Sequence, residues 1–461
     1  MEEERIKKAK QKNVKLYPIY KIFAWDLLFY YSIIFLFLNQ AKGLDSASIV
    51  FGNAFYPIFK LVFQAFVPGI IHITGQRISN IIGNILVSLS ILYIILASAS
   101  VKNLIISNLI MAIGYILKGV CESGILDECI TDVEKKNSKF AKIDGRGSAY
   151  WYIFEAISSV TTGYLFVINA YIPMYLCFIF CIIGTIISCQ FEPYEVKQER
   201  PKEEQGLKRL VSKMDLSWQE YKFIFKSKRL RALLLFSGLF YGMLFIRSTL
   251  TSSLLVDIGI PDKYFGIISG LFTIFAAITT WKQNVFHRLL HNKVLTVFSL
   301  LYTTSLIIVG LTIILNINYT ATLVIVFIMM TIQNMIKGPY YTLIKRYLNS
   351  FTDPHLLVKI YSVNSIMEDI GGILISLIVS WLLGFKTTAY TALFIGIGSL
   401  ILFIFILEYM KTRLGLKPEE YRKADIEFIP KTKKDNIEEK EHVIEIAIGV
   451  NEEGETSVDI K

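Results

Sequence analysis

Charged side chains interrupt several long apolar segments of this 461-residue sequence. A charge at membrane depth is costly, so such a side chain usually faces a helix-bundle interior or a water-filled cavity. A guanidinium can hold a carboxylate or phosphate by two hydrogen bonds, and a carboxyl group can take up and release a proton. The sequence therefore predicts a polar pathway for a solute or an ion. The cations are Lys60, Lys118, Arg247 and Lys337, and the acids are Asp26, Glu122, Glu155, Glu368 and Asp369.

Lys118 and Glu122 are four residues apart and would share one face of a helix. They either neutralise each other or use other partners. The order of Lys before Glu is the less favourable one in an isolated helix, which favours other partners. Lys337 is followed four residues later by Tyr341 and not by an acid. Its partner must therefore come from another helix, a substrate or water.

Arg247 and Lys60 have no acid one helical turn away. We expect Arg247 and Lys337 to hold the acidic group of a solute, with Lys60 and Lys118 as further binding residues. The alternative is a structural ion pair between Arg247 and Glu155 or Asp26. Three aromatic residues near these cations are expected to pack against the apolar part of the solute: Tyr241, Tyr340 and Tyr341.

The composition indicates an all-α polytopic membrane protein. Hydrophobic residues make up 53% of the chain and charged residues 19%, against about 45–50% and 25% in soluble domains. The apolar residues form blocks of about twenty, the length that an α-helix needs to cross a bilayer. A β-barrel would show short segments of alternating hydrophobicity instead. We predict twelve helices, over 19–39, 47–71, 80–99, 103–127, 148–168, 171–190, 230–256, 262–286, 294–315, 320–345, 358–383 and 387–409.

Lysine and arginine gather on one side of these helices. Of the 48 such residues, 40 lie in the two terminal segments and in the loops on their side. The positive-inside rule makes that side cytoplasmic, so both termini are expected there, in a multi-pass protein of the cell membrane. The formal charge of +10 then reflects topology and contact with anionic lipid headgroups, and it does not indicate nucleic-acid binding.

The two halves of the chain repeat. Residues 111–119 read MAIGYILKG and 330–338 read MTIQNMIKG, which aligns two Lys-Gly pairs at an offset of 219. AKIDGRGS at 141–148 aligns with VKIYSVNS at 358–365 at an offset of 217. Every third predicted helix lacks a charged interior residue. This pattern predicts a parallel duplication of six helices. The expected segments are a basic N-terminus (1–18), a six-helix bundle (19–190), a cytoplasmic amphipathic linker (191–229), a second six-helix bundle (230–409) and a charged cytoplasmic tail (410–461).

Twelve helices, a 6+6 parallel repeat and a long central loop resemble the major facilitator superfamily over roughly residues 15–410. The resemblance implies that helices 1, 4, 7 and 10 line a central cavity and that helices 3, 6, 9 and 12 lie outside. Part of the family signature between helices 2 and 3 is present in PGIIHITGQR (68–77), where Gly75 and Arg77 match. The resemblance implies that this turn gates the cytoplasmic side. The basic residue that the family often has in helix 4 is matched by Lys118, followed by Gly119.

The resemblance implies a secondary active transporter working by alternating access. No nucleotide-binding loop is present, so an ion or solute gradient must supply the energy, and we expect proton coupling or charge pairing at the acids named above. The substrate is expected to be a small anionic or zwitterionic organic solute, bound by a monomer. The alternatives are a multidrug or lipophilic-compound efflux pump and a non-transporting receptor or scaffold. No metal motif or nucleophile elbow is found, so we expect no enzyme, cofactor or metal.

Overall fold

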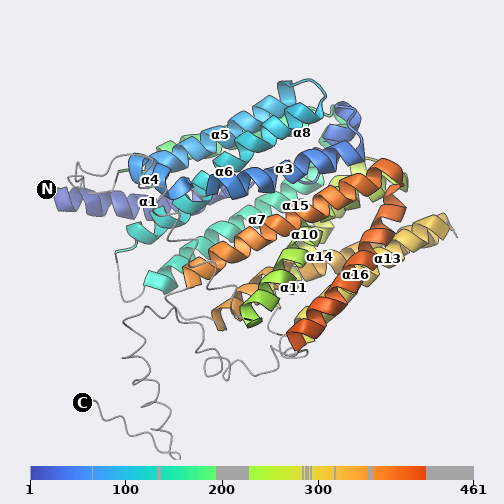
Figure 1. Ribbon diagram of the computed structural model, residues 1–461. Helices are drawn as coiled ribbons and strands as arrows, with labels where there is room; N and C mark the ends of the chain where they lie inside the picture. Colours follow the sequence, from blue (N-terminus) through green and yellow to red (C-terminus); the bar gives the residue numbers. More distant parts are fainter. Residues whose placement is uncertain are drawn as a thin grey trace, which may run out of the picture.

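The structure, a computed structural model, describes residues 2–64, 66–131, 136–193, 228–282, 285, 290, 293–315, 318–350 and 357–411. These residues form helices and connecting turns, with no strand among them (Figure 1). The predicted linker and tail lie outside the described residues except at their edges. The N-terminal half contains α1 (Glu2–Ala24), α2 (Ile34–Leu36), the short π-helix η1 (Phe37–Ala41), α3 (Ser46–Gln64), α4 (Val67–Thr74), α5 (Gln76–Leu96), α6 (Val101–Cys129), α7 (Lys136–Ile168) and α8 (Ile172–Cys189).

The C-terminal half contains α10 (Lys228–Asp257), α11 (Lys263–Trp281), α13 (Val294–Leu315), α14 (Tyr319–Ser350), α15 (Leu357–Phe385) and α16 (Thr388–Lys411). Within the described residues, eleven helices are long and apolar enough to cross a membrane. They correspond to the predicted helices 2 to 12. Hydropathy identified these helices because each contains an apolar stretch long enough to cross the hydrocarbon core of a bilayer.

The prediction of one continuous helix over 19–39 is wrong. Helix α1 begins at Glu2 and ends at Ala24, and regular structure resumes only at Ile34. Between them Phe29 adopts a positive φ of 63°, a conformation that a residue with a side chain rarely takes and that ends regular helix. The predicted second helix is also divided, because Pro68 cannot donate the backbone hydrogen bond that would join α3 to α4.

Helix packing repeats between the halves. In the N-terminal half α1 packs against α7, α5 against α6, and α5 against α8. The corresponding pairs in the C-terminal half are α10 with α15, α13 with α14, and α13 with α16. In Figure 1, α3, α5, α6 and α8 of the N-terminal half lie in the upper part of the view, and α11, α13, α14 and α16 of the C-terminal half lie in the lower part. The two-bundle architecture is therefore the 6+6 layout that the sequence repeat predicts.

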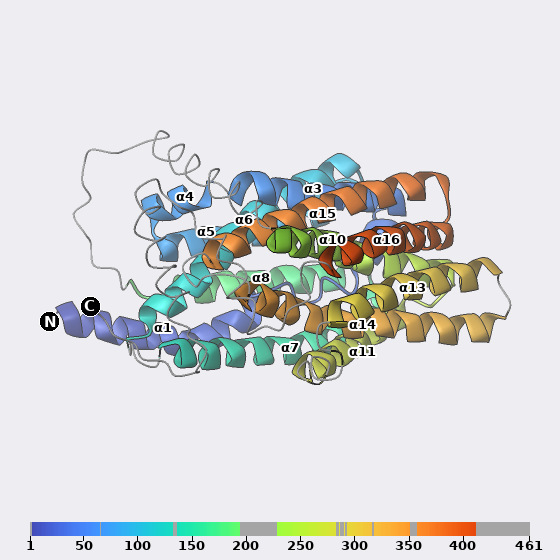
Figure 2. The same cartoon turned by 60° about the horizontal axis from the view of Figure 1, so that its bottom comes forward.

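The halves meet along two helix pairs, α3 with α15 and α7 with α11. Both views show α3 and α15 side by side (Figures 1 and 2). The second contact needs glycine: a Cβ atom added at Gly163 would lie 2.5 Å from the carbonyl oxygen of Lys263, and one at Gly266 would overlap the carbonyl oxygen of Ser159. Small residues thus let the backbones touch, as is common between membrane helices.

Candidate functional site

The interruption of the first membrane segment is built around Asp26. Its Oδ1 atom accepts hydrogen bonds from the Leu27 backbone N–H (2.9 Å), the Tyr31 hydroxyl (2.8 Å) and the Tyr115 hydroxyl on α6 (2.6 Å). The indole N–H of Trp151 on α7 donates to the Asp26 carbonyl oxygen over 3.3 Å. A short acidic side chain that bonds nearby backbone competes with helix formation. Asp26 therefore both interrupts the helix and is fixed inside the N-terminal half.

Lys118 caps the end of α1 that this interruption leaves open. Its ammonium donates to the carbonyl oxygen of Ala24 and lies 4.3 Å from the centre of the Tyr115 ring. A cation at a helix C-terminus satisfies an unpaired carbonyl and interacts well with the helix dipole. Lys118 forms no ion pair with Glu122, although both are buried. The Glu122 Oε2 atom has no hydrogen-bond partner.

Arg247 on α10 is held by a neutral side chain. Its Nη1 donates to Oδ1 of Asn334 on α14, and the Asn334 amide is anchored on the carbonyl oxygen of Met330 at 2.8 Å. The Nε atom of Arg247 is buried and has no partner. Neither Glu155 nor Asp26 forms an ion pair with it, so the structural pairing left open by the sequence is absent here. Glu155 is buried and accepts from Ser159 on its own helix at 3.0 Å.

Lys337 and Gln333 add two further donors on α14. Lys337 has no hydrogen bond or ion pair among the described residues, and it interacts electrostatically with Arg247 and, from the N-terminal half, with Asp26 and Glu155. Gln333 precedes it by four residues, is 2% exposed, and leaves its Nε2 atom without a partner. The two thus share one helix face. Two mutually repelling cations and two unpartnered donors, Arg247 Nε and Gln333 Nε2, leave this region short of an acceptor.

The predicted aromatic residues divide into two groups. Tyr340 is fully buried, hydrogen-bonds Ser237, and packs 4.5 Å from the Phe240 ring, so it belongs to the core of the C-terminal half. Tyr241 and Tyr341 are half-buried, and their ring centres lie 6.4 Å apart. Tyr241 and Tyr341 are the two that can line a site beside the cations.

Lys60 does not lie with the other cations. Its ammonium on α3 pairs with Oδ1 of Asp369 on α15 at 3.0 Å and donates to the Ser365 hydroxyl at 3.3 Å. The neighbouring acid Glu368 points into the C-terminal half, where it accepts from Asn364 (2.8 Å) and Ser237 (3.2 Å). The ion pair between Lys60 and Asp369 therefore joins the two halves at membrane depth.

Comparison with known proteins agrees with this architecture. The family model described as Major Facilitator Superfamily matches residues 17–376. The chain belongs to the Major Facilitator Superfamily. A search of curated protein sequences finds no significant match.

Solved structures of similar fold include a nucleoside transporter, NupG, at 12% identity and a TM-score of 0.66, covering 87% of this chain and 99% of that one. A POT family transporter in complex with 5-aminolevulinic acid has 14% identity and a TM-score of 0.62, with 87% and 96% covered. Another, in complex with a thioalcohol-conjugated peptide, has 13% identity and a TM-score of 0.61, with the same coverage. At these identities the similarity shows the fold alone.

The superfamily's signature turn takes a local role in this structure. Gly75 joins α4 to α5 with a φ of 81°, which favours glycine. Arg77 donates to the carbonyl oxygens of Phe191 and Cys189 at the end of α8, inside the N-terminal half. Most of the matching loop of the C-terminal half, at 283–292, lies outside the described residues. The gating role predicted for Gly75 and Arg77 stays a prediction.

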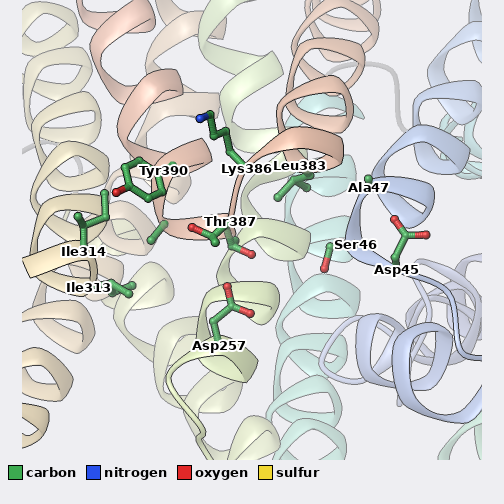
Figure 3. Close-up of a pocket in the computed structure, with 12 residues that line it drawn as sticks. Asp45, Ser46, Ala47, Asp257, Ile313, Ile314, Leu383, Lys386, Thr387 and Tyr390 are labelled. Carbon is green, nitrogen blue, oxygen red and sulfur yellow. The ribbon is translucent and has the colours of Figure 1, made fainter. Parts of the chain in front are cut away.

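Hydroxyl and amide side chains join the halves at one end, which we call the distal side; it carries Ser46, Asp257, Lys263 and Thr388. The Ser253 hydroxyl hydrogen-bonds Ser46 (2.9 Å) and Thr388 (3.0 Å). Two further hydrogen bonds join the halves near this end: Ser380 donates to the Ala47 carbonyl oxygen at 2.9 Å, and Gln40 donates to Asp262 at 2.9 Å. A pocket of about 530 Å³ lies here, lined by residues of both halves that include Asp45, Asp257 and Lys386 (Figure 3). The halves are therefore in contact at the distal side.

Proposed function

We propose that this superfamily member is a secondary active transporter that moves a small anionic or zwitterionic organic solute by alternating access, driven by protons. In this proposal the distal side faces outward, both termini are cytoplasmic, and the protein acts as a monomer in the cell membrane among anionic lipids. The hydrogen bonds across the distal side then mark a state closed to the outside.

The observation that carries the proposal is the unpaired cation pair of Arg247 and Lys337. Each interacts with the other, and neither has an acid within ion-pair distance among the described residues. Uncompensated charges at membrane depth are costly and mark solute or ion pathways. A carboxylate or phosphate would accept from Arg247 Nε, Lys337 and Gln333 together. The acids Asp26 and Glu155 face the same region from the other half and would attract the amino group of a zwitterion.

Buried carboxyl groups support proton coupling. Glu122 and Glu155 are 8% exposed, and each has one oxygen without a hydrogen-bond partner. Such an oxygen can carry a proton without breaking an existing hydrogen bond. An efflux pump for lipophilic cations is less well supported, since the cations found here would repel such a solute. A receptor or scaffold would need no unpaired Arg247 and Lys337.

The test combines a screen for ligand binding with a measurement of solute uptake into proteoliposomes. Purified protein would be screened by thermal shift against carboxylates, phosphates, amino acids, short peptides, nucleosides and organic cations. We expect stabilisation by an anionic or zwitterionic compound, because a ligand at about 100 times its Kd adds about 2.7 kcal/mol. Its uptake into proteoliposomes should then follow an imposed pH gradient in sodium-free buffer, and Arg247→Gln and Lys337→Gln should each reduce it at least tenfold.

Arg231→Gln is the matched control. Arg231 lies on the same helix as Arg247 and donates to the Tyr409 hydroxyl at 3.0 Å and 2.7 Å, away from the central cations. Uptake by this variant should stay close to that of the unmodified protein. Stabilisation by organic cations alone, unchanged in Arg247→Gln and Lys337→Gln, would show that the substrate charge is wrong. Binding without flux in any gradient would favour the receptor.

A further inference from the structure

Among the ion pairs formed between described residues, the one between Lys60 and Asp369 is the only one that joins the two halves. Asp26 and Glu155 bond within the N-terminal half, and Glu368 within the C-terminal half. Asp369, by contrast, has its partner on α3 of the opposite half, 3.0 Å away. The attraction between these two charges therefore acts directly on the contact between the bundles.

The two members of the pair are placed unequally. The Asp369 side chain is 1% exposed, whereas that of Lys60 is 28% exposed. The Oδ2 atom of Asp369 is buried without a partner. A proton can thus add to the carboxylate and leave a neutral acid that remains buried, while Lys60 keeps its charge and has access to water. Separating the pair with both charges in place would instead leave a buried carboxylate uncompensated.

The charged and titratable groups around Asp369 come from three helices. Lys60 and Tyr56 approach from α3, Tyr241 approaches from α10, and Glu368 precedes it on α15. Lys60 is the single cation in this set. Neutralising Asp369 therefore removes the one strong attraction that links α3 to α15 at this depth.

From this geometry we infer that Asp369 is the proton-binding residue that couples protonation to separation of the two halves, with Lys60 as its releasable partner. The inference rests on the proposed proton-driven transport. A proton from water adds to a carboxylate oxygen of Asp369, the ion pair is lost, and the proton returns to water when the pair forms again. Because the proton binds better where the pair is absent, proton binding shifts the population toward separated bundles.

The pair can act on the distal contacts through α3 itself. Lys60 is fourteen residues from Ser46, or about 20 Å along the helix axis. At the distal end the same two helices are joined by the hydrogen bond from Ser380 to the Ala47 carbonyl oxygen. When the ion pair between Lys60 and Asp369 is lost, the contact between α3 and α15 is weaker. These helices are then still joined by the neutral hydrogen bond at their distal end.

Distances across the distal side test this inference without any solute. Spin labels would be placed at exposed Lys102, in the N-terminal half, and exposed Lys386, in the C-terminal half, of the full-length protein in nanodiscs. The five native cysteines would be replaced by serine or alanine. On acidification from pH 8 to pH 5 we expect a longer-distance population to grow severalfold. Asp369→Asn should show that population at every pH, with no further response.

Two more variants separate pairing from a general loss of stability. Lys60→Gln should, like Asp369→Asn, show the longer-distance population at every pH, because the ion pair is absent whatever the protonation state of Asp369. The exchanged variant Lys60→Asp/Asp369→Lys should recover a response to pH. Glu4→Gln, which breaks an exposed ion pair with Lys8, is the control and should behave as the unmodified protein.

A distance distribution that does not change between pH 8 and pH 5, or a full response in Asp369→Asn, would overturn the inference. If Asp369→Asn does not fold, a Lys60→Gln variant that keeps the full response to pH would overturn it equally. Failure of the proposed function looks different: no anionic or zwitterionic compound binds or is taken up, while the distances still respond to pH.

Discussion

Tyr115 on α6 and Asn334 on α14 occupy matching positions of the internal repeat, 219 residues apart, and each hydrogen-bonds a charged side chain: Asp26, just after α1, and Arg247 on α10. Tyr115 donates to Asp26, and Asn334 accepts from Arg247. The duplicated scaffold thus presents an acid from one half and a base from the other. In the proposed transporter, a solute between them would meet opposite charges at its two ends, which favours a zwitterion over a simple anion.

Gln333→Leu should weaken binding of the anionic or zwitterionic solute. The Gln333 Nε2 atom is a buried donor without a partner, and a hydrogen bond to a charged group is worth about 1.5–3 kcal/mol. We expect Kd to rise at least about tenfold, measured by titration calorimetry on the purified variant. An unchanged Kd would mean that Gln333 does not contact the solute.

Lys118→Met should affect stability and not recognition. Its ammonium donates to the Ala24 carbonyl oxygen at the end of α1, which is a structural role. The helix end would lose a charged cap, so we expect a fall in thermal midpoint of several degrees. The Kd of the solute should stay within about threefold. A loss of binding as large as that of Arg247→Gln would instead place Lys118 in the site.

Gly266→Ala should loosen the contact between α7 and α11. The added Cβ would overlap the carbonyl oxygen of Ser159, and overpacking of this kind typically costs about 1–3 kcal/mol. The thermal midpoint should fall, and the distance between distal labels should increase. Gly119→Ala is the matched control, because its Cβ would meet no atom within 4 Å. Equal midpoints for the two variants would contradict the close approach.

Asp45 supplies a pH-dependent cap outside the membrane spans. Its Oδ2 accepts from the Ser48 backbone N–H at 3.1 Å at the start of α3. Partial burial acts to raise the pKa of Asp45, but hydrogen bonds from Ser48 and the local backbone outweigh it and lower the pKa below its usual value. The folded state therefore gains stability from the carboxylate above the unfolded pKa of about 3.9, and that gain is lost as pH falls.

Asp45→Ala should accordingly lower stability by about 1 kcal/mol at pH 7. The difference in thermal midpoint from the unmodified protein should shrink at pH 4 and below. Asp45→Asn keeps an N-capping side chain and serves as the control. A difference that stays constant over this pH range would mean that the charge plays no part.

Topology can be checked with a membrane-impermeant thiol reagent on intact cells. In a background without native cysteines, cysteine at Lys102 or Lys386 should react from outside, and cysteine at exposed Lys142 should react only after permeabilisation. The reverse pattern would invert the assignment of the distal side.

Hydropathy and charge were sufficient to predict eleven of the spans, the repeat and the family. The interruption at Asp26 was missed because the side chain that stops the helix lies in a stretch otherwise apolar enough to continue it. The role of Lys118 depends on that interruption, which frees the Ala24 carbonyl oxygen. Lys60 and Asp369 are 309 residues apart, so their pairing appears only once the halves are placed together.

Gln333 and Asn334 were overlooked because a search for charges passes over amides. The repeat contained a usable signal, since MTIQNMIKG has two amides where MAIGYILKG has Gly114 and Tyr115. Aligning the halves for polar differences, and not only for shared residues, would have identified both positions.

In the proposed alternating-access cycle, the hydroxyl groups on the distal side would keep closing and opening nearly balanced. The hydroxyl groups of Ser46, Ser253 and Ser380 make hydrogen bonds between the halves, and water can replace each of these bonds at little enthalpic cost. At about 1 kcal/mol each, a few such bonds hold the closed state by only a few kcal/mol. A change of about 2.7 kcal/mol moves a two-state equilibrium from even to about 99:1. In the proposed cycle, one bound solute or proton would therefore be enough to reverse the preference, and neither state would become a trap that stalls transport.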